Sequence, residues 1–192
     1  MGRVSRAEAA KHREEVVTSA ARLFRERGVG AVSVQDVSAA VGLTHGGFYK
    51  NFASKEALAG LAATDAFGDD LERMVAGTSD AAGARDALLV EYLRAGHRDA
   101  PGEGCALTGF AADSARTGDE SPLRRSYTEG AKAILARLEE YQDERDGGTD
   151  SRARAIVELA TMVGALTLAR ATAGDPLSDE ILDSVRAALL SR

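Results

Sequence analysis

The sequence predicts an all-α protein of about nine helices. Proline occurs only three times in 192 residues, alanine is frequent, and runs of β-branched residues are few. This composition favours helices over strands. Hydrophobic residues make up 44% of the chain and recur every three or four positions, which is the period of a helix with one buried face. We therefore expect a three-helix domain at the N-terminus, followed by a larger helical bundle.

The charge of the chain is divided unevenly along its length. Residues 1–55 contain nine Lys and Arg against five Asp and Glu, a formal net charge of +4, although the whole chain carries −6. The remaining residues therefore carry −10. A basic N-terminal part on an acidic body indicates one end that faces nucleic acid, although chance asymmetry is the simpler alternative.

Several protein classes are excluded by what the sequence lacks. No apolar run approaches the roughly 18 residues that a membrane span needs, and the first residues do not form a signal peptide. The single cysteine, Cys105, cannot form an intrachain disulfide. We therefore expect a cytoplasmic protein that does not bind membranes.

The first predicted helix runs from Arg6 to Arg27. Its buried stripe is expected to contain Val16, Ala20 and Phe24, which are spaced at helical intervals. Gly28 should end this helix, because glycine readily adopts the left-handed conformation of a C-cap. The helix would then support the segment that follows, which is too short to form a core alone.

Residues 33–56 contain two short helices joined by a tight turn. Ser33 and Asp36 have the spacing of a capping box at the start of the first helix. Gly42 should end the first helix, Thr44 should cap a second helix through HGGFYKNF, and Ser54 should cap a third. Two helices joined by a short turn that contains glycine form the helix-turn-helix pattern, whose second helix reads the major groove of DNA.

The second of these helices has an unusual composition for a packing helix. Gly46 and Gly47 each cost about 1 kcal/mol relative to alanine in a helix interior. A helix whose backbone must approach another surface closely can use such residues. Phe48 and Phe52 share one face and should anchor the helix to the core. Side chains able to donate hydrogen bonds to phosphate lie around the glycines: Thr44, His45, Tyr49, Lys50 and Lys55.

Three segments, LFRERG at 23–28, SVQDVSAAVGL at 33–43 and GGFYKNFASKEAL at 46–58, occur in this order. Together they resemble the N-terminal domain of the TetR/AcrR family of bacterial transcriptional regulators. The resemblance implies a DNA-binding domain at 1–54 and a ligand-binding and dimerisation domain at 55–192. It also implies a repressor that binds a palindromic operator in double-stranded DNA and is released by a small-molecule effector. The residues expected to contact DNA are Ser33, Gln35, Thr44, His45, Gly46, Gly47, Tyr49, Lys50 and Lys55.

The remainder of the chain predicts six further helices. The first begins at Lys55, near the expected DNA surface, and extends into the body, so it is the natural lever between the two parts. The last helix should be capped by Ser178. The predicted ranges are 55–75, 81–97, 105–116, 123–145, 151–172 and 179–192.

The predicted helix at 151–172 is apolar on nearly all sides and must therefore be buried on several of them. The family resemblance implies a homodimer in which this helix and the last one pair with their counterparts. A charge on the surface of the helix, as in Leu166→Glu, should then produce monomers or unfolded protein.

The resemblance also implies an effector pocket inside the helical body. The candidate lining residues carry no formal charge, which favours an apolar or aromatic effector. Each candidate is more often an ordinary core residue than a ligand contact. The candidates are Phe67, Leu71, Met74, Leu89, Tyr92, Cys105, Phe110, Tyr127 and Met162.

Cys105 offers a second possible trigger, since it is expected in the first turn of a helix, where the helix dipole can lower the pKa of a thiol. Glu103 opposes that effect, and a buried structural cysteine is the favoured alternative.

No catalytic motif, cofactor-binding motif or metal-ligand cluster is present, and the three histidines are widely separated. We therefore expect neither an enzyme nor a cofactor. The alternative from another class is a ligand-binding helical bundle or helical enzyme in which the helix-turn-helix pattern is coincidental.

Overall fold

The computed structural model describes residues 6–75, 81–146 and 150–191, and within these ranges the protein is all-α, as predicted. The described residues form ten α-helices and one short 3-10 helix, one α-helix more than expected. The elements are α1 (Arg6–Arg27), α2 (Val34–Ala40), α3 (His45–Asn51), α4 (Lys55–Val75), α5 (Ala81–Tyr92), α6 (Ala95–Asp99), η1 (Pro101–Glu103), α7 (Ala106–Arg116), α8 (Pro122–Asp146), α9 (Ser151–Ala171) and α10 (Pro176–Leu190).

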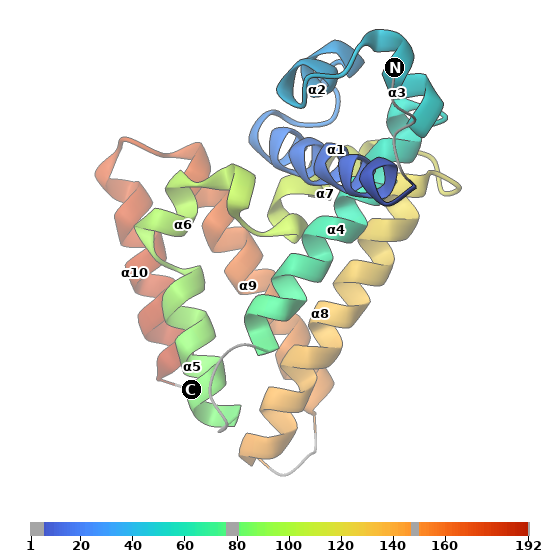
Figure 1. Cartoon of the computed structure of the whole chain (residues 1–192). Helices are drawn as coiled ribbons and strands as arrows, with labels where there is room; N and C mark the ends of the chain where they lie inside the picture. The colour runs from blue at the N-terminus through green and yellow to red at the C-terminus, as the bar shows by residue number, and fades with distance from the viewer. Residues whose placement is uncertain (1–5, 76–80, 147–149, 192) are drawn as a thin grey trace.

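Helices α1, α2 and α3 lie together at one end of the molecule, and the long helices α4 and α8 run side by side away from them (Figure 1). Helices α5, α9 and α10 pack together in the body through a second apolar cluster that includes Leu89, Met162 and Leu182. Helix α7 lies between α1 and the body and contacts both. None of the described helices is long and apolar enough to cross a lipid bilayer.

One continuous set of buried side chains joins the N-terminal helices to the body. Val16 and Phe24 of α1 and Phe48 of α3 belong to the same cluster as Leu58 of α4 and Leu138 of α8. The positions predicted for the buried stripe of α1 are confirmed, because Val16, Ala20 and Phe24 are fully buried. The helix-turn-helix is therefore supported by α1 and α4 together.

The predicted helix at 81–97 is wrong, because the chain leaves the helical conformation at Arg94 and divides it into α5 and α6. In a continuous helix, the carbonyl oxygens of Tyr92 and Leu93 would accept hydrogen bonds from backbone N–H groups. Here they are bonded by side chains instead. Arg186 Nη1 donates to the Leu93 oxygen at 3.0 Å, and His97 Nδ1 lies 2.7 Å from the Tyr92 oxygen. The backbone hydrogen bonds of α5 therefore end at the residues whose carbonyl oxygens bind Arg186 and His97.

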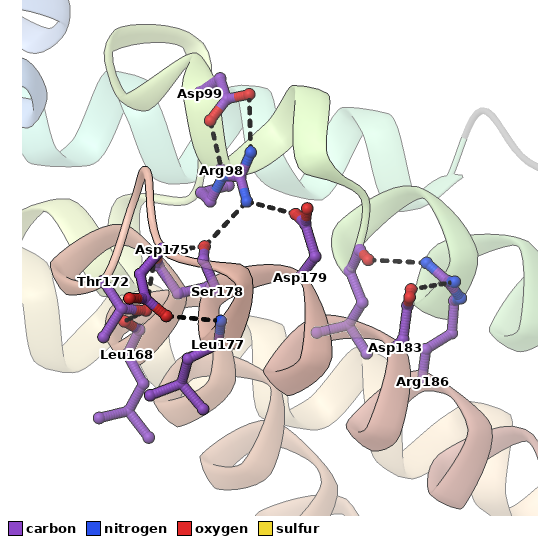
Figure 2. Close-up of polar contacts among 12 residues, drawn as sticks. Arg98, Asp99, Leu168, Thr172, Asp175, Leu177, Ser178, Asp179, Asp183 and Arg186 are labelled. Atoms are coloured by element: carbon purple, nitrogen blue, oxygen red, sulfur yellow. Dashed lines mark hydrogen bonds and ion pairs between the residues drawn. The ribbon is translucent and has the colours of Figure 1, made fainter.

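The prediction that Ser178 caps the last helix is also wrong. Helix α10 begins at Pro176, a residue favoured in the first turn, and Asp175 caps it by accepting the Leu177 N–H at 2.9 Å. Ser178 is buried and donates to the Ala169 oxygen at 2.7 Å. Figure 2 shows these contacts and the guanidinium of Arg98, which joins α6 to Ser178 at 2.8 Å.

Candidate functional sites

The start of α2 is fixed by local hydrogen bonds, as the sequence predicts. The Ser33 N–H donates to Asp36 Oδ2 at 2.7 Å, and the Asp36 N–H donates to Ser33 Oγ at 3.1 Å. These two bonds form the capping box. Hydrogen bonds from Ser33 lower the pKa of the Asp36 carboxyl, so the charged form that holds the cap is favoured.

Four residues connect α2 to α3 in a turn. Gly42 has a φ of 68°, where a side chain would be strained, and the Leu43 N–H donates to the Ser38 oxygen at 2.8 Å. Thr44 caps α3 by accepting the Gly47 N–H at 3.2 Å. The predicted caps and break are therefore confirmed, and the two short helices have the connection of a helix-turn-helix.

Helix α3 presents one face to the core and the other to solvent. Phe48 and Phe52 are buried with their ring centroids 5.4 Å apart, and the Arg13 guanidinium lies 5.1 Å from the Phe52 ring. On the opposite side Lys50 is exposed, and 53% of Tyr49 is accessible. The Tyr49 ring also packs edge to face against Phe48 at 5.2 Å, so the predicted contact residue Tyr49 lies at the border of the buried face, whereas Lys50 points to solvent.

The two adjacent glycines of α3 have different surroundings. A Cβ atom added to Gly46 would have no heavy atom within 4 Å, so this position faces open space. A Cβ added to Gly47 would lie 3.2 Å from Leu43 Cδ2 and 3.3 Å from Thr44 Oγ1. The absence of a side chain at Gly47 therefore leaves room for the Leu43 and Thr44 side chains of the turn. Its absence at Gly46 leaves the outer surface of α3 low, meaning that no side chain projects from it there.

Three other candidates for DNA contact differ in their surroundings. Lys55 Nζ donates to the Val29 and Val32 oxygens at 3.0 and 3.1 Å, so it ties α4 to the segment before α2. Gln35 is exposed near the start of α2. His45 is the first residue of α3, but its side chain lies outside the part of the chain that the structure describes.

The body contains a cavity of about 540 Å³ between α4, α5, α8, α9 and the segment that includes α6 and η1. Four of the nine predicted pocket residues line it, namely Met74, Tyr92, Cys105 and Met162. Its apolar wall also contains leucine and isoleucine side chains from α5, α7, α8 and α9: Leu88, Leu107, Ile134, Leu138 and Leu159.

The other five predicted pocket residues do not line this cavity and pack in the core instead. The Phe67 and Tyr127 rings stack edge to face at 5.7 Å, and Leu71 packs against the same main core. Phe110 is fully buried in that core, and Leu89 is fully buried in the second cluster. Helical spacing identified these residues as inward-facing, but it does not distinguish a cavity wall from a filled interior.

The cavity also has charged and titratable side chains in its lining, none of which was among the nine candidates. The segment where the predicted helices at 81–97 and 105–116 meet forms one wall of the cavity. Ion pairs join Asp70 to Arg73 and Glu91 to Arg94 within the polar lining. The charged and titratable lining residues are Asp70, Arg73, Glu91, Arg94, His97 and Glu103.

His97 is held in one protonation state by two backbone partners. Its Nδ1 lies 2.7 Å from the Tyr92 carbonyl oxygen and must donate, whereas its Nε2 accepts the Cys105 N–H at 3.1 Å. The ring is therefore neutral with the proton on Nδ1. Burial, followed by the positive charges of Arg170, Arg73 and Arg94, lowers the pKa of His97, in agreement with that state.

Cys105 is the N-cap residue of α7 and is buried, so it does not lie in the first helical turn as predicted. Burial raises the pKa of its thiol, and the Asp70 carboxylate raises it further. The neutral thiol is favoured, which supports the structural alternative. Among the described residues, no group of three or more His, Cys, Asp or Glu side chains could hold a metal ion.

A buried ion pair crosses the body between α5 and α9. The Arg85 guanidinium of α5 donates to Glu158 Oε2 of α9 at 2.6 and 3.0 Å and to the Leu189 oxygen of α10 at 3.1 Å. Gln142 of α8 donates to the same carboxylate oxygen at 2.9 Å. Three helices are therefore joined through one carboxylate, and the Arg85 guanidinium adds α10 as a fourth.

Helix α9 has one buried face and one exposed apolar face. Leu166 is fully buried, so it is not the surface position that the sequence suggested. Leu168 is 57% exposed, Val157 is also exposed, and a Cβ added to Gly164 would meet open space. Together with the exposed Leu177 of α10, these positions form an apolar surface that this single chain leaves uncovered.

The comparisons with known proteins agree with this geometry. The family model described as "Bacterial regulatory proteins, tetR family" matches residues 16–61. An HTH-type transcriptional repressor, DhaR of Mycobacterium sp. (strain GP1), is 30% identical over 134 residues, covering 68% of this chain and 67% of that protein. An uncharacterized HTH-type transcriptional regulator of Mycobacterium tuberculosis is 31% identical over 165 residues, covering 82% of this chain and 84% of that protein.

The fold is also found among solved structures. A TetR transcriptional regulator from Chloroflexus aurantiacus J-10-FL superposes with a TM-score of 0.80 and 26% sequence identity. The match covers 96% of this chain and 95% of that one. The similarity therefore extends over the body as well as the helix-turn-helix.

Proposed function

Since this chain belongs to the TetR family of bacterial regulatory proteins, we propose that it is a repressor which a small molecule releases from DNA. It is a DNA-binding transcriptional regulator with a helix-turn-helix. The observation that carries the proposal is the outer face of α3, where Gly46 leaves the surface low beside the exposed Tyr49 and Lys50. A low helix surface flanked by hydrogen-bond donors suits close approach to a major groove.

In the proposed complex, residues 1–54 bind DNA and residues 55–192 bind the effector and the second subunit. Lys50 and Tyr49 contact phosphates, Thr44 assists them, and His45 with the backbone at Gly46 lies nearest the base edges. Ser33 and Gln35 approach the adjacent phosphates from α2. Lys55, whose ammonium is held by two carbonyls, positions the segment before α2 instead.

The proposed dimer forms through the exposed faces of α9 and α10. An apolar helix face with small residues such as Gly164 allows two helices to approach closely, and a four-helix interface would cover it. A dimer with two-fold symmetry reads a palindromic operator whose half-sites lie on one side of the DNA. Because it acts on DNA inside a bacterium, we place the protein in the cytoplasm.

The proposed effector occupies the cavity in the body. Its walls are apolar along α8 and α9 and charged along α4, α5 and the segment from Arg94 to Cys105. The two ion pairs in the charged wall already neutralise their members, so an effector need not carry a full charge. The walls suit an amphipathic molecule with an apolar body and a polar group.

The proposal is tested by selecting duplexes from a random DNA library with the purified protein. A repressor of this kind should enrich a palindromic sequence and bind it with a strong dependence on salt. Enrichment of no sequence, or binding that is equal for all sequences, would favour a ligand-binding bundle that does not regulate transcription.

A further inference from the structure

The N-terminus of α7 is held by the wall of the cavity and not by its own cap. Cys105 occupies the N-cap position but makes no capping hydrogen bond with its side chain. The Cys105 N–H donates to His97 Nε2 at 3.1 Å, and the Ala106 N–H donates to Asp70 Oδ2 at 2.8 Å. Both acceptors line the cavity. The first donors of α7 are thus satisfied by side chains that an occupant of the cavity would touch.

The other end of the same peptide group faces the DNA-binding helices. The Gly104 carbonyl oxygen accepts a hydrogen bond from Arg25 Nη1 of α1 at 3.1 Å. Arg25 is only 9% exposed, and its Nε is buried without a hydrogen-bond partner, so its guanidinium has little freedom to find another acceptor. Because a peptide group is planar and rigid, His97 and Arg25 hold opposite ends of one rigid unit.

The surroundings of this peptide group leave it little room. A Cβ added to Gly104 would lie 2.6 Å from Arg170 Nη2 and 3.0 Å from His97 Nε2, so a side chain there would displace the Arg170 guanidinium. Arg170 in turn donates to the His97 and Arg98 oxygens at 3.0 and 3.2 Å. The group therefore cannot turn without moving His97, Arg25 or both.

Helix α7 makes a second contact with the DNA-binding helices at its other end. Asp113 accepts the Val29 N–H at 2.8 Å, in the segment that leads from α1 to α2. Helix α7 is therefore bonded to α1 through Arg25 and to the segment before α2 through Asp113.

We propose that the Gly104–Cys105 peptide group couples the cavity to the DNA-binding helices, with His97 and Arg25 as its positioning residues. This inference rests on the proposed function. An occupant that displaces the His97 ring removes the acceptor of the Cys105 N–H, the peptide group turns, and its carbonyl moves away from Arg25. Coupling between two sites is reciprocal, so DNA binding must strengthen the Cys105–His97 hydrogen bond.

The reciprocal effect can be measured without knowing the effector. The probe is the duplex enriched by the wild-type protein, and the readout is amide hydrogen exchange followed by NMR. The Cys105 amide reports the proposed bond, and the Leu138 amide in the core of α8 reports global opening in the same sample. In the wild type, DNA should slow exchange at Cys105 by at least about 5-fold more than at Leu138.

Four variants of the full chain separate coupling from packing. His97→Gln keeps an acceptor near the Nε2 position and should retain the differential protection, whereas His97→Phe should lose it. Arg25→Met should also lose it while the His97 bond remains, and Arg22→Met, a matched change on α1 at an arginine paired with Glu26, should retain it. Circular dichroism establishes that each variant is folded, and the two positions test the two ends of the peptide group independently.

Each outcome decides the proposal. Loss of differential protection in both Arg25→Met and His97→Phe, with retention in His97→Gln and Arg22→Met, supports it. Any other pattern among the variants, or no differential protection in the wild type, overturns it while leaving the repressor function intact. If the wild type enriches no DNA sequence, the proposed function and this inference fall together.

Discussion

Lys50 carries an exposed ammonium group, so its substitution is the most direct test of phosphate binding by α3. Lys50→Ala should weaken binding to all DNA sequences alike and lower the slope of log affinity against log salt by about 1, because one phosphate contact is lost. Lys132→Ala, at an exposed lysine of α8, is the matched control and should change neither quantity. An unchanged affinity and slope for Lys50→Ala would remove this residue from the DNA contacts.

The neighbouring glycines of α3 should respond differently to added side chains. Gly46→Ala should raise stability by less than about 1 kcal/mol, since a Cβ there meets open space, yet it should weaken DNA binding. Gly47→Val should lower stability through contacts with Leu43 and Thr44. Urea unfolding and DNA titration of both variants separate the two effects. Loss of DNA binding only in the Gly47 variant would contradict the orientation of α3.

His97 should make stability depend on pH. Its pKa is lowered in the folded protein, so the unfolded chain binds the proton more readily, and stability is lost as pH falls below the unfolded value of about 6.5. Urea unfolding between pH 5 and 7.5 should show this loss in the wild type and less of it in His97→Gln. Asp65 and Asp70, whose pKa values are raised, act with the opposite sign but contribute equally to both proteins. Parallel curves would show that His97 does not titrate as described.

For single residues, the sequence predicts those hydrogen bonds whose two partners are close to each other along the chain. The caps at Ser33 and Thr44 were predictable because acceptor and donor lie within three residues of each other. The partners of Lys55 were not, because the carbonyls that hold it lie 26 and 23 residues away. The roles of Gly46 and Gly47 also required the position of Leu43.

Among the helices, the ion pair between Arg85 and Glu158 should be the most sensitive junction. Glu158→Ala leaves the buried guanidinium with only the exposed Asp86 carboxylate as a counter-charge and should cost about 3 kcal/mol of unfolding free energy. The double replacement Arg85→Met with Glu158→Leu should cost less than the single change, because no charge remains buried without a partner. Urea unfolding of the three proteins measures this. A double variant that is less stable than the single one would mean that the pair contributes net stability.

The boundaries of helices were predictable where their own residues set them, as in α1 and α4. The end of α5 was not, because Arg186 of α10 takes the Leu93 carbonyl from a position 93 residues away. The cavity shows the same limitation. Met74 and Met162 were recognised as inward-facing. The charged wall around Arg94 and His97 was not recognised, because charged residues in a segment near a loop look like solvent-exposed residues in the sequence.

For the whole molecule, the exposed face of α9 predicts a dimer. Leu168→Glu should give a folded monomer, because the side chain lies on the uncovered surface. Leu166→Glu should instead unfold the protein, because Leu166 is fully buried. Light scattering and circular dichroism at micromolar concentration distinguish these results. A wild-type monomer at that concentration would exclude the proposed interface.

The continuous core between α1 and α4 also decides which part of this protein can be transplanted into a relative. A chimera cut at residue 54 would separate Phe24 from its packing partners in α4 and Arg25 from the Gly104 carbonyl. A cut on either side of α2 and α3 keeps α1 with the body and crosses the core contacts of Val37, Phe48 and Phe52 and the hydrogen bonds of Lys55. For the proposed repressor, we therefore expect that exchanging the pair of short helices transfers operator specificity, with α1 kept together with the body.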